Sequence, residues 1–311
     1  MSPLLTPFPW FGGKSRVAAT VWSRFGDVHH YIEPFAGSLA VLFGRPHVAR
    51  HETVNDLDCF LANFWRGIAL DPVAVAHYAS WPQNEADLHA RHLYIGAQTD
   101  FRERMHTDPL FFDPKIAGWW LYGISIWIGD GWCQAFKSRR RIQLTSPQGV
   151  NRFTLIPGTT LPFDATCDER TAEIIRYALL IADRLRNTRV CCGDWGRVVT
   201  PAIMNSRTPT GVFLDPPYGT PEVASDLYTH HNRSVAAECA AWAIANGDNP
   251  NYRIAVCGYE GEHEFPDTWE CVPWKTCGGL GGLKGPGQNE NRFKERIWFS
   301  PHCNKPQGES T

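Results

Sequence analysis

The stretch that decides the fold is GVFLDPPYGT, residues 211–220. Its apolar run, residues 212–214, is short enough to be a buried strand, and two prolines, which cannot donate hydrogen bonds to a neighbouring strand, end it. Asp215 therefore stands where a strand stops and a loop opens. Ligands of open α/β sheets bind just outside the carboxyl ends of the strands. A carboxylate, a carbonyl of the rigid Pro216-Pro217 unit and the ring of Tyr218 should meet there, and this set suits a flat ring that carries an amino group.

Chain length and net charge limit the class of protein. With 311 residues, the chain is long for one compact core, so we expect either one domain with an insertion or two small domains. Thirty basic residues against 32 acidic ones give a formal net charge of -2, which excludes a globally basic nucleic-acid footprint. A polyanionic partner must therefore meet a local patch.

Cysteine usage and hydropathy limit the partners and the compartment. The ten cysteines form no C-x-x-C pair, which favours buried thiols in a reducing compartment over disulfides or a zinc site. The longest apolar window, residues 119–128, is far shorter than the roughly 20 residues that cross a bilayer. The N-terminus lacks a signal pattern. We expect a soluble cytoplasmic protein without metal or membrane partners.

Near the start, Gly12 and Gly13 precede Lys14 and a helical pattern over residues 17–25. Glycines let the backbone approach a ligand closely, and Lys14 stands beside a helix N-terminus, which favours anions. A simple turn before a helix is the alternative. The G-G-K motif lacks the spacing of a P-loop, so it does not by itself predict a nucleotide site.

Two further motifs follow in the first 60 residues. YIEPFAGSLAVLF, residues 31–43, indicates a strand, a turn and the start of a helix, without the G-x-G-x-x-G of a dinucleotide site. NDLD, residues 55–58, places Asp56 beyond Glu33 by close to the interval of about 20 residues at which doubly wound folds present an acid to a ribose. Asp58 could cap the next helix, which would leave Asp56 for that role.

Residues 59–187 interrupt the alternation of strand and helix. Helical patterns separated by prolines fill its first part, and a last helix is expected over residues 168–187 with Thr166 and Glu169 as a capping box. Between them lie four cations and two alternating stretches that predict a β-hairpin around residues 147–149. A cluster of charged residues of this kind is usually part of a solvent-exposed surface. In an aromatic-rich insertion it could instead bind phosphates and reach base edges.

The remaining segments complete the predicted sheet. A strand over residues 189–195 carries Asp194, a ligand-binding acid or a turn aspartate, and a helix is expected over residues 234–246. The strands RIAVCGY and ERIWFSP follow. The glycine-rich segment between them is either a connector or a loop that closes over nucleic acid. The polar residues 301–311 are expected to fray.

Together, these motifs resemble the Dam-like, alpha-group DNA adenine-N6 methyltransferases, some of them phage-type, which use S-adenosylmethionine (SAM). D-P-P-Y is the catalytic motif of that family, residues 8–14 are similar to its P-F-x-x-W-x-G-G-K, and residues 33–43 resemble its E-P-F-x-G-x-G-x-x-F. Leu39 replaces the second glycine of the latter, so we expect a less open loop there. In this order, the motifs cover nearly the whole catalytic part of the chain. Residues 59–187 match only in position and general character.

The resemblance implies a Rossmann-like SAM-dependent methyltransferase sheet, built from residues 1–58 and 188–300. A mostly helical target-recognition domain containing the β-hairpin, residues 59–187, is inserted, and residues 301–311 form the tail. The implied catalytic residues are Asp215, Pro216, Pro217 and Tyr218. The implied SAM contacts are Trp10, Lys14, Glu33, Pro34, Phe35, Gly37, Asp56, Asp194 and Asp215. DNA contacts are expected from Lys137, Arg139, Arg140, Arg141, Lys284 and Arg292.

Within this set the resemblance gives individual roles. Lys14 is expected to bind the carboxylate of SAM, Asp56 its ribose, and Asp194 to lie near its adenine. The target amine is a poor nucleophile because its lone pair is delocalised into the base. If Asp215 and the carbonyl of Pro216 accept its two N–H bonds, the lone pair is drawn toward the methyl group. The adenine must be swung out of double-stranded DNA, and Tyr218 would stack on it.

Two other functions stay open. Methylation of the N4 amine of cytosine needs the same chemistry, although the first motif residue there is more often serine. A SAM-binding or DNA-binding protein without catalysis is the second, and the intact D-P-P-Y motif speaks against it. We expect double-stranded DNA as partner and a monomer or weak dimer. A phage, a restriction–modification pair and chromosome maintenance are all open settings.

Overall fold

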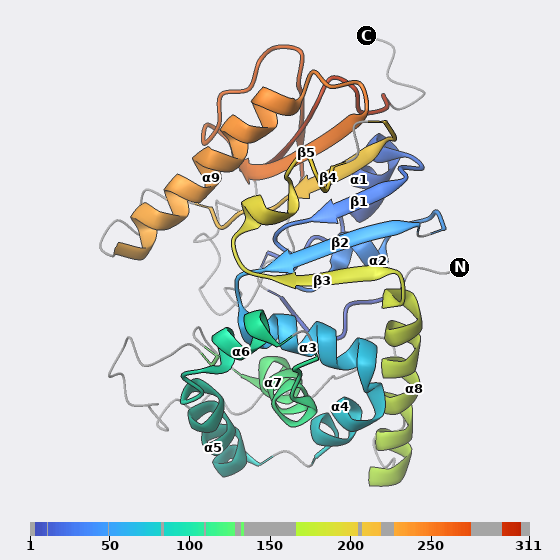
Figure 1. The fold of residues 1–311 in the computed structure, drawn as a ribbon, viewed down its shortest axis with the longest axis vertical. Helices are drawn as coiled ribbons and strands as arrows, with labels where there is room; N and C mark the ends of the chain where they lie inside the picture. The colour runs from blue at the N-terminus through green and yellow to red at the C-terminus, as the bar shows by residue number, and fades with distance from the viewer. Residues whose placement is uncertain are drawn as a thin grey trace, which may run out of the picture. The chain divides into compact units, whose positions relative to one another are not determined.

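The computed structural model describes residues 4–10, 12–48, 50–81, 84–108, 110–127, 132–133, 166–204, 207–218, 227–274 and 294–305. The fold is α/β, with a seven-stranded, mostly parallel sheet in the order β3-β2-β1-β4-β5-β7-β6 (Figure 1). This confirms the predicted Rossmann-like sheet. The chain divides into two compact units. The first holds Met1–Pro3, Phe11–Asn55 and Asp194–Thr311, and the second holds Leu4–Trp10 and Asp56–Gly193.

The strands, in chain order, are β1 (His30–Glu33), β2 (His51–Asp56), β3 (Thr188–Cys192), β4 (Thr210–Leu214), β5 (Tyr252–Tyr259), β6 (Glu270–Pro273) and β7 (Glu295–Phe299). β1 pairs in parallel with β2 and with β4, and β4 pairs in parallel with β5. β7 runs antiparallel to β5 and to β6. The sequence pattern did not predict β6, because its half-exposed side chains carry no apolar alternation and it ends in a proline, which an edge strand tolerates.

The strand order reverses at β1. β2 lies on one side of β1 and β4 on the other, so the carboxyl ends of β1 and β4 are neighbours. Both strands are buried along their whole length, as central parallel strands are. A reversal of this kind is where open α/β sheets bind ligands. Glu33, the last residue of β1, and Asp215, which follows β4, therefore reach the same edge of the sheet.

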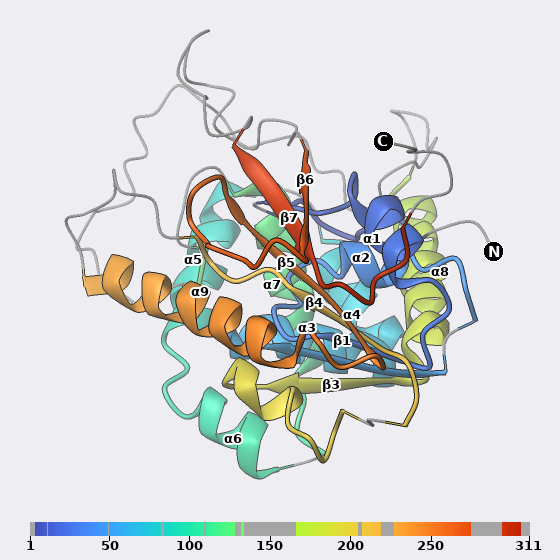
Figure 2. The same cartoon turned by 90° about the horizontal axis from the view of Figure 1, so that it is seen from above.

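The helices of the first unit are α1 (Ala18–Phe25), α2 (Ala40–Phe43), the 3-10 helix η1 (Trp195–Val198) and α9 (Leu227–Asn246). Figure 2 shows α1 and α2 on one side of β4 and β5 and α9 on the other. α1 buries Val21, Trp22 and Phe25 and ends at Gly26, whose φ of 59° favours glycine. α9 begins seven residues before the predicted start and ends where the pattern predicted.

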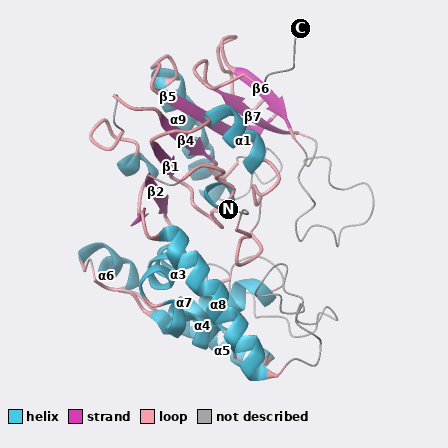
Figure 3. Cartoon of the chain, turned by 90° about the vertical axis from the view of Figure 1, so that its right-hand side faces the viewer, coloured by secondary structure: helices cyan, strands magenta, loops and turns pink. Residues whose placement is uncertain are grey.

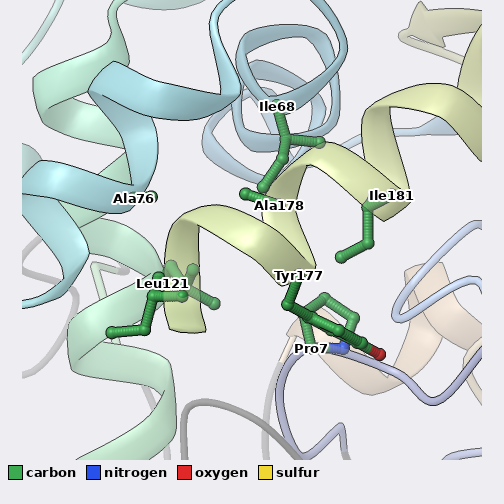
Figure 4. A pocket seen from close by; sticks show the side chains of 8 residues that line it. Pro7, Ile68, Ala76, Leu121, Tyr177, Ala178 and Ile181 are labelled. Carbon is green, nitrogen blue, oxygen red and sulfur yellow. The ribbon is translucent and has the colours of Figure 1, made fainter. Parts of the chain in front are cut away.

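The second unit, within the residues described, is helical apart from β3 (Figure 3). Its helices are α3 (Cys59–Leu70), α4 (Pro72–Ala79), α5 (Glu85–Gly96), α6 (Phe101–Thr107), α7 (Pro114–Ile126) and α8 (Cys167–Leu185). The buried ring of Phe8 packs edge-on against Phe64 and Trp120, with ring centroids 5.5 and 5.1 Å apart. A small apolar pocket between helices, lined by Ile68, Leu121, Tyr177 and Ile181 among others, lies in this core (Figure 4).

Local signals set the ends of several helices. The Asp58 carboxylate accepts hydrogen bonds from the N–H groups of Phe60 and Leu61, so it caps α3 as predicted. Thr166 and Glu169 form the predicted capping box of α8. The helical pattern that begins at residue 85 forms two helices, α5 and α6, because α5 ends at Gly96, a poor helix former.

Residues 301–305 do not fray, in contrast to the expectation for the tail. The backbone N–H of Asn304 donates to the carbonyl of Arg24 at 2.7 Å, and that of Cys303 donates to the carbonyl of Ser300 at 3.0 Å. The side chain of Cys303 is buried. The predicted β-hairpin lies outside the described residues, and the role of residues 59–187 in target recognition stays a prediction.

Candidate active site

An ion pair joins the two motifs at the centre of the site. Lys14 lies in the turn before α1, and its Nζ is 2.9 Å from Oδ2 of Asp215, which follows β4. The same ammonium donates to the carbonyl of Gly12 at 2.8 Å. The φ of Gly12 is 71°, which folds the chain so that this carbonyl faces the ammonium. The side chain of Lys14 is 5% exposed and that of Asp215 is 21% exposed, so solvent reaches the pair only on the side of the carboxylate.

The charge of Lys14 is stabilised by its surroundings. Burial lowers the pKa of this ammonium, but the carboxylate of Asp215, followed by Cys257 and Glu295, outweighs burial, and the net shift is upward. Lys14 is therefore a fixed positive charge at the carboxyl end of β4. Its Nζ also lies 5.3 Å from the ring centroids of Tyr218 and of Trp274.

Tyr218 points back toward the motif that contains it. Its hydroxyl lies 3.0 Å from Oδ1 of Asp215 and 3.3 Å from Oε2 of Glu295, the first residue of β7. Its ring meets that of Tyr259 edge-on, with centroids 4.8 Å apart. Burial, followed by the nearby charge of Asp215, raises the pKa of Tyr218 well above its ordinary value, so the hydroxyl keeps its hydrogen at neutral pH.

Glu295 is the second carboxyl of the site and was not foreseen from the sequence. Burial raises its pKa to about 7, while Lys14 opposes this shift and the charge of Asp215 adds to it. No motif contains Glu295, which is simply the first residue of an ordinary strand pattern. Antiparallel pairing sets it opposite Tyr259 of β5, whose ring contacts Tyr218.

The E-P-F-A-G turn is held by the end of β2. The side-chain N–H of Asn55 donates to the carbonyl of Pro34 at 3.1 Å, and the N–H of Ala36 donates to the carbonyl of Asn55 at 2.9 Å. Gly37 has a φ of 46°. Leu39 has a φ of 57° while its side chain is fully buried. The backbone thus keeps, at Leu39, the left-handed conformation that glycine adopts most easily.

Glu33 and Phe35 have partners within the first unit. Oε2 of Glu33 accepts the hydroxyl of Tyr31 at 3.0 Å in a fully enclosed environment. Burial raises the pKa of Glu33 well above its ordinary range, although the bond from Tyr31 opposes this. The half-buried ring of Phe35 is stacked with that of Trp195, with centroids 6.2 Å apart.

The structure places the other predicted residues as follows. Asp194 is exposed, and its carboxylate accepts the N–H of Gly196 at 2.9 Å, so it caps η1. Trp10 and Asp56 belong to the second unit. The ring of Trp10 packs against Phe8, and Oδ1 of Asp56 accepts the N–H of Asp58 at 3.0 Å. The six predicted DNA-binding cations lie outside the described residues.

The structure thus brings together Lys14, Asp215 and Tyr218, and adds Glu295. The family model of the D12 class N6 adenine-specific DNA methyltransferases matches residues 10–118. The matched residues include the G-G-K, E-P-F-A-G and N-D-L-D motifs, whereas D-P-P-Y lies beyond them. No curated protein matches the chain. Over these residues the chain is similar to the D12 class of N6 adenine-specific DNA methyltransferases, in agreement with the resemblance found in the motifs.

Proposed function

We propose that this enzyme transfers the methyl group of SAM to the exocyclic amine of an adenine that has been swung out of double-stranded DNA, at a specific sequence. The observation that carries the proposal is the ion pair of Lys14 with Asp215. Lys14 lies in the segment that matches the methyltransferase family, and Asp215 lies in the D-P-P-Y motif outside that segment. The two signals were found independently, and they meet at one edge of the sheet.

The residues at this edge fit the methyl donor. SAM carries a carboxylate, and Lys14 is a buried, fixed positive charge at the carboxyl end of β4, the strand that pairs with β1. Gly37 in that turn has no side chain to obstruct a ligand, and its backbone is bent at positive φ. Glu33, Pro34 and Phe35 complete the turn, while Trp10, Asp56 and Asp194 are proposed to hold the ribose and adenine ends. SAM supplies an electrophilic methyl group.

The chain itself activates the target amine. The carboxylate of Asp215 and the carbonyl of Pro216 accept one amine N–H each, which draws the nitrogen lone pair out of the ring. Pro217 keeps the loop rigid, and the ring of Tyr218 packs on the extruded base, a contact worth about 1–3 kcal/mol. Positioning and electrostatics are sufficient, because the methylated nitrogen is acidic and loses its proton without a strong base.

DNA binding is proposed for Lys137, Arg139, Arg140, Arg141, Lys284 and Arg292. These cations are a local positive charge in a chain whose formal net charge is -2. The affinity for DNA should therefore depend on the few phosphate contacts that they make. Replacing the four cations between residues 137 and 141 with alanine should weaken binding to all DNA sequences and flatten its dependence on salt.

The decisive experiment offers unmethylated double-stranded DNA and SAM with a labelled methyl group. Wild-type protein should incorporate label, and digestion to nucleosides should place it on N6-methyladenine. Label on N4-methylcytosine would support the cytosine alternative instead. Asp215→Ala should abolish incorporation while calorimetric SAM binding falls only modestly. Asp267→Ala, which removes an exposed carboxylate of the same unit, is the control. Normal incorporation by Asp215→Ala would refute the assignment.

Two further measurements address the finer claims. Methylation sequencing of DNA from cells that express the chain should show modification at one short sequence, whereas scattered modification would contradict site specificity. With 2-aminopurine in place of the target adenine, fluorescence should rise when protein binds, because an extruded base leaves the stack. Unchanged fluorescence would count against base flipping.

A further inference from the structure

The hydroxyl of Tyr218 lies between two carboxyl groups. It is 3.0 Å from Oδ1 of Asp215 and 3.3 Å from Oε2 of Glu295. A hydroxyl has one hydrogen, so it donates to one of these oxygens at a time. The other contact is favourable only if the second carboxyl carries a proton and donates to the Tyr218 oxygen. The protonation of Glu295 therefore decides where the hydrogen of Tyr218 points.

The protonated and ionised forms of Glu295 differ in how strongly the Tyr218 hydroxyl bonds to Oδ1 of Asp215. With Glu295 protonated, its O–H donates to Tyr218, and the hydrogen of Tyr218 is directed at Oδ1 of Asp215. With Glu295 ionised, the two carboxylates compete for that hydrogen. Oδ2 of Asp215 faces Lys14 in both cases, so Oδ1 is the oxygen whose hydrogen bonding changes. A weaker bond from Tyr218 leaves Oδ1 a better acceptor for an amine N–H.

We propose that Glu295 is a positioning residue for methyl transfer, which acts through the hydroxyl of Tyr218 to set how well Oδ1 of Asp215 accepts the target amine. The inference rests on the proposed role of Asp215. The ionised form of Glu295 is the active one, since it draws the Tyr218 hydrogen away from Asp215. Proton exchange occurs between Glu295 and solvent, and no proton is consumed in the cycle.

The surroundings of Glu295 place its change of protonation in the neutral pH range. Its side chain is buried, and burial, with the charge of Asp215, raises its pKa to about 7 against the opposing effects of Lys14 and of the Tyr218 hydrogen bond. The charged and titratable groups that face it from the packed elements are Lys14, Asp215, Tyr218, Cys257, Tyr259 and Glu262. The neighbouring side chain of Arg296 pairs with Glu260 at 2.8 Å.

The first test compares pH profiles of kcat for wild type and Glu295→Gln. Glutamine keeps the size of the side chain and donates an N–H to Tyr218, so it imitates the protonated carboxyl at every pH. The two proteins should have nearly equal kcat at about pH 5, and wild type should exceed the variant roughly tenfold at about pH 8.5, since tenfold corresponds to one modest hydrogen-bond difference. KM for SAM and for DNA should not change.

A matched control and a double variant separate this role from a structural one. Glu260→Gln removes an exposed carboxylate near Glu295 and should follow the wild-type profile. Tyr218→Phe removes the hydroxyl, so adding Glu295→Gln to it should cost nothing further at any pH. A constant ratio of wild type to Glu295→Gln at all pH values would overturn the proposal. An equal cost of Glu295→Gln with and without the Tyr218 hydroxyl would also overturn it.

A second readout does not depend on catalysis. Carbon-13 labelling of the glutamate carboxyl groups, with Glu295→Gln to identify the signal, gives the titration of Glu295 by NMR. Tyr218→Phe should raise the pKa of Glu295, because it removes a bond that stabilises the carboxylate. An unchanged titration would overturn the inference. Absence of methyl incorporation by wild type would refute the proposed function alone, because the titration would still decide the coupling.

Discussion

Nζ of Lys14 lies 2.9 Å from Oδ2 of Asp215, so the turn before α1 and the loop after β4 share one buried ion pair. Lys14→Met should leave this carboxylate without its cation and lower kcat/KM roughly tenfold or more, the range for a hydrogen bond to a charged group. Arg16→Met, an exposed cation two residues away, is the control. Labelled-methyl kinetics measure both. Equal activity of Lys14→Met and Arg16→Met would contradict the role of the pair.

Leu39 combines a left-handed backbone with a fully buried side chain. Leu39→Ala should lose about 2–5 kcal/mol of unfolding free energy, because it leaves a cavity and keeps the unfavourable φ. Leu39→Gly loses the same contacts but relieves a strain of about 1–2 kcal/mol. We therefore expect the glycine variant to be the more stable of the two in urea unfolding, the reverse of the usual order in helices. A Leu39→Ala variant more stable than Leu39→Gly would show that the backbone at Leu39 is not strained.

Asp56 and Asp58 stand two residues apart with different predicted roles. Asp58→Ala removes the cap of α3 and should cost about 1 kcal/mol of stability, with little effect on SAM binding. Asp56→Asn keeps an oxygen for the N–H of Asp58 but loses the charge proposed to hold the ribose. It should weaken SAM binding about tenfold and leave stability unchanged. Calorimetry and thermal unfolding of both variants measure this contrast, and loss of SAM affinity in Asp58→Ala alone would reverse the assignment.

Glu33 predicts a pH dependence of stability. Its pKa is raised well above the ordinary value of 4.5 by burial, so the folded protein holds this proton more tightly than the unfolded chain does. The stabilisation is present below the unfolded pKa and is lost as pH rises toward the folded pKa. Glu33→Gln removes this dependence. Its stability relative to wild type should therefore increase steadily above about pH 4.5 in urea unfolding at several pH values. A difference that does not vary with pH would mean that Glu33 is not held protonated.

Local patterns predicted much of the fold. The apolar run before Asp215 is β4, Asp58 caps α3, and Thr166 and Glu169 begin α8, because each signal acts within one turn or strand. β6 was missed because an edge strand with half-exposed side chains needs no apolar alternation. The expected fraying of the tail was wrong at Asn304, whose N–H has a partner on the carbonyl of Arg24.

The order of the motifs in the sequence was by itself enough to indicate the resemblance to the DNA adenine methyltransferases and to single out Asp215, since these features depend on which residues follow one another. Only the tertiary structure decided that Lys14 pairs with Asp215 and that Glu295 shares the hydroxyl of Tyr218. Tyr218 and Glu295 are 77 residues apart, and the sheet brings them together by setting β7 against β5. Hydrogen bonds between distant strands determine such contacts, and no local pattern encodes which strands become neighbours.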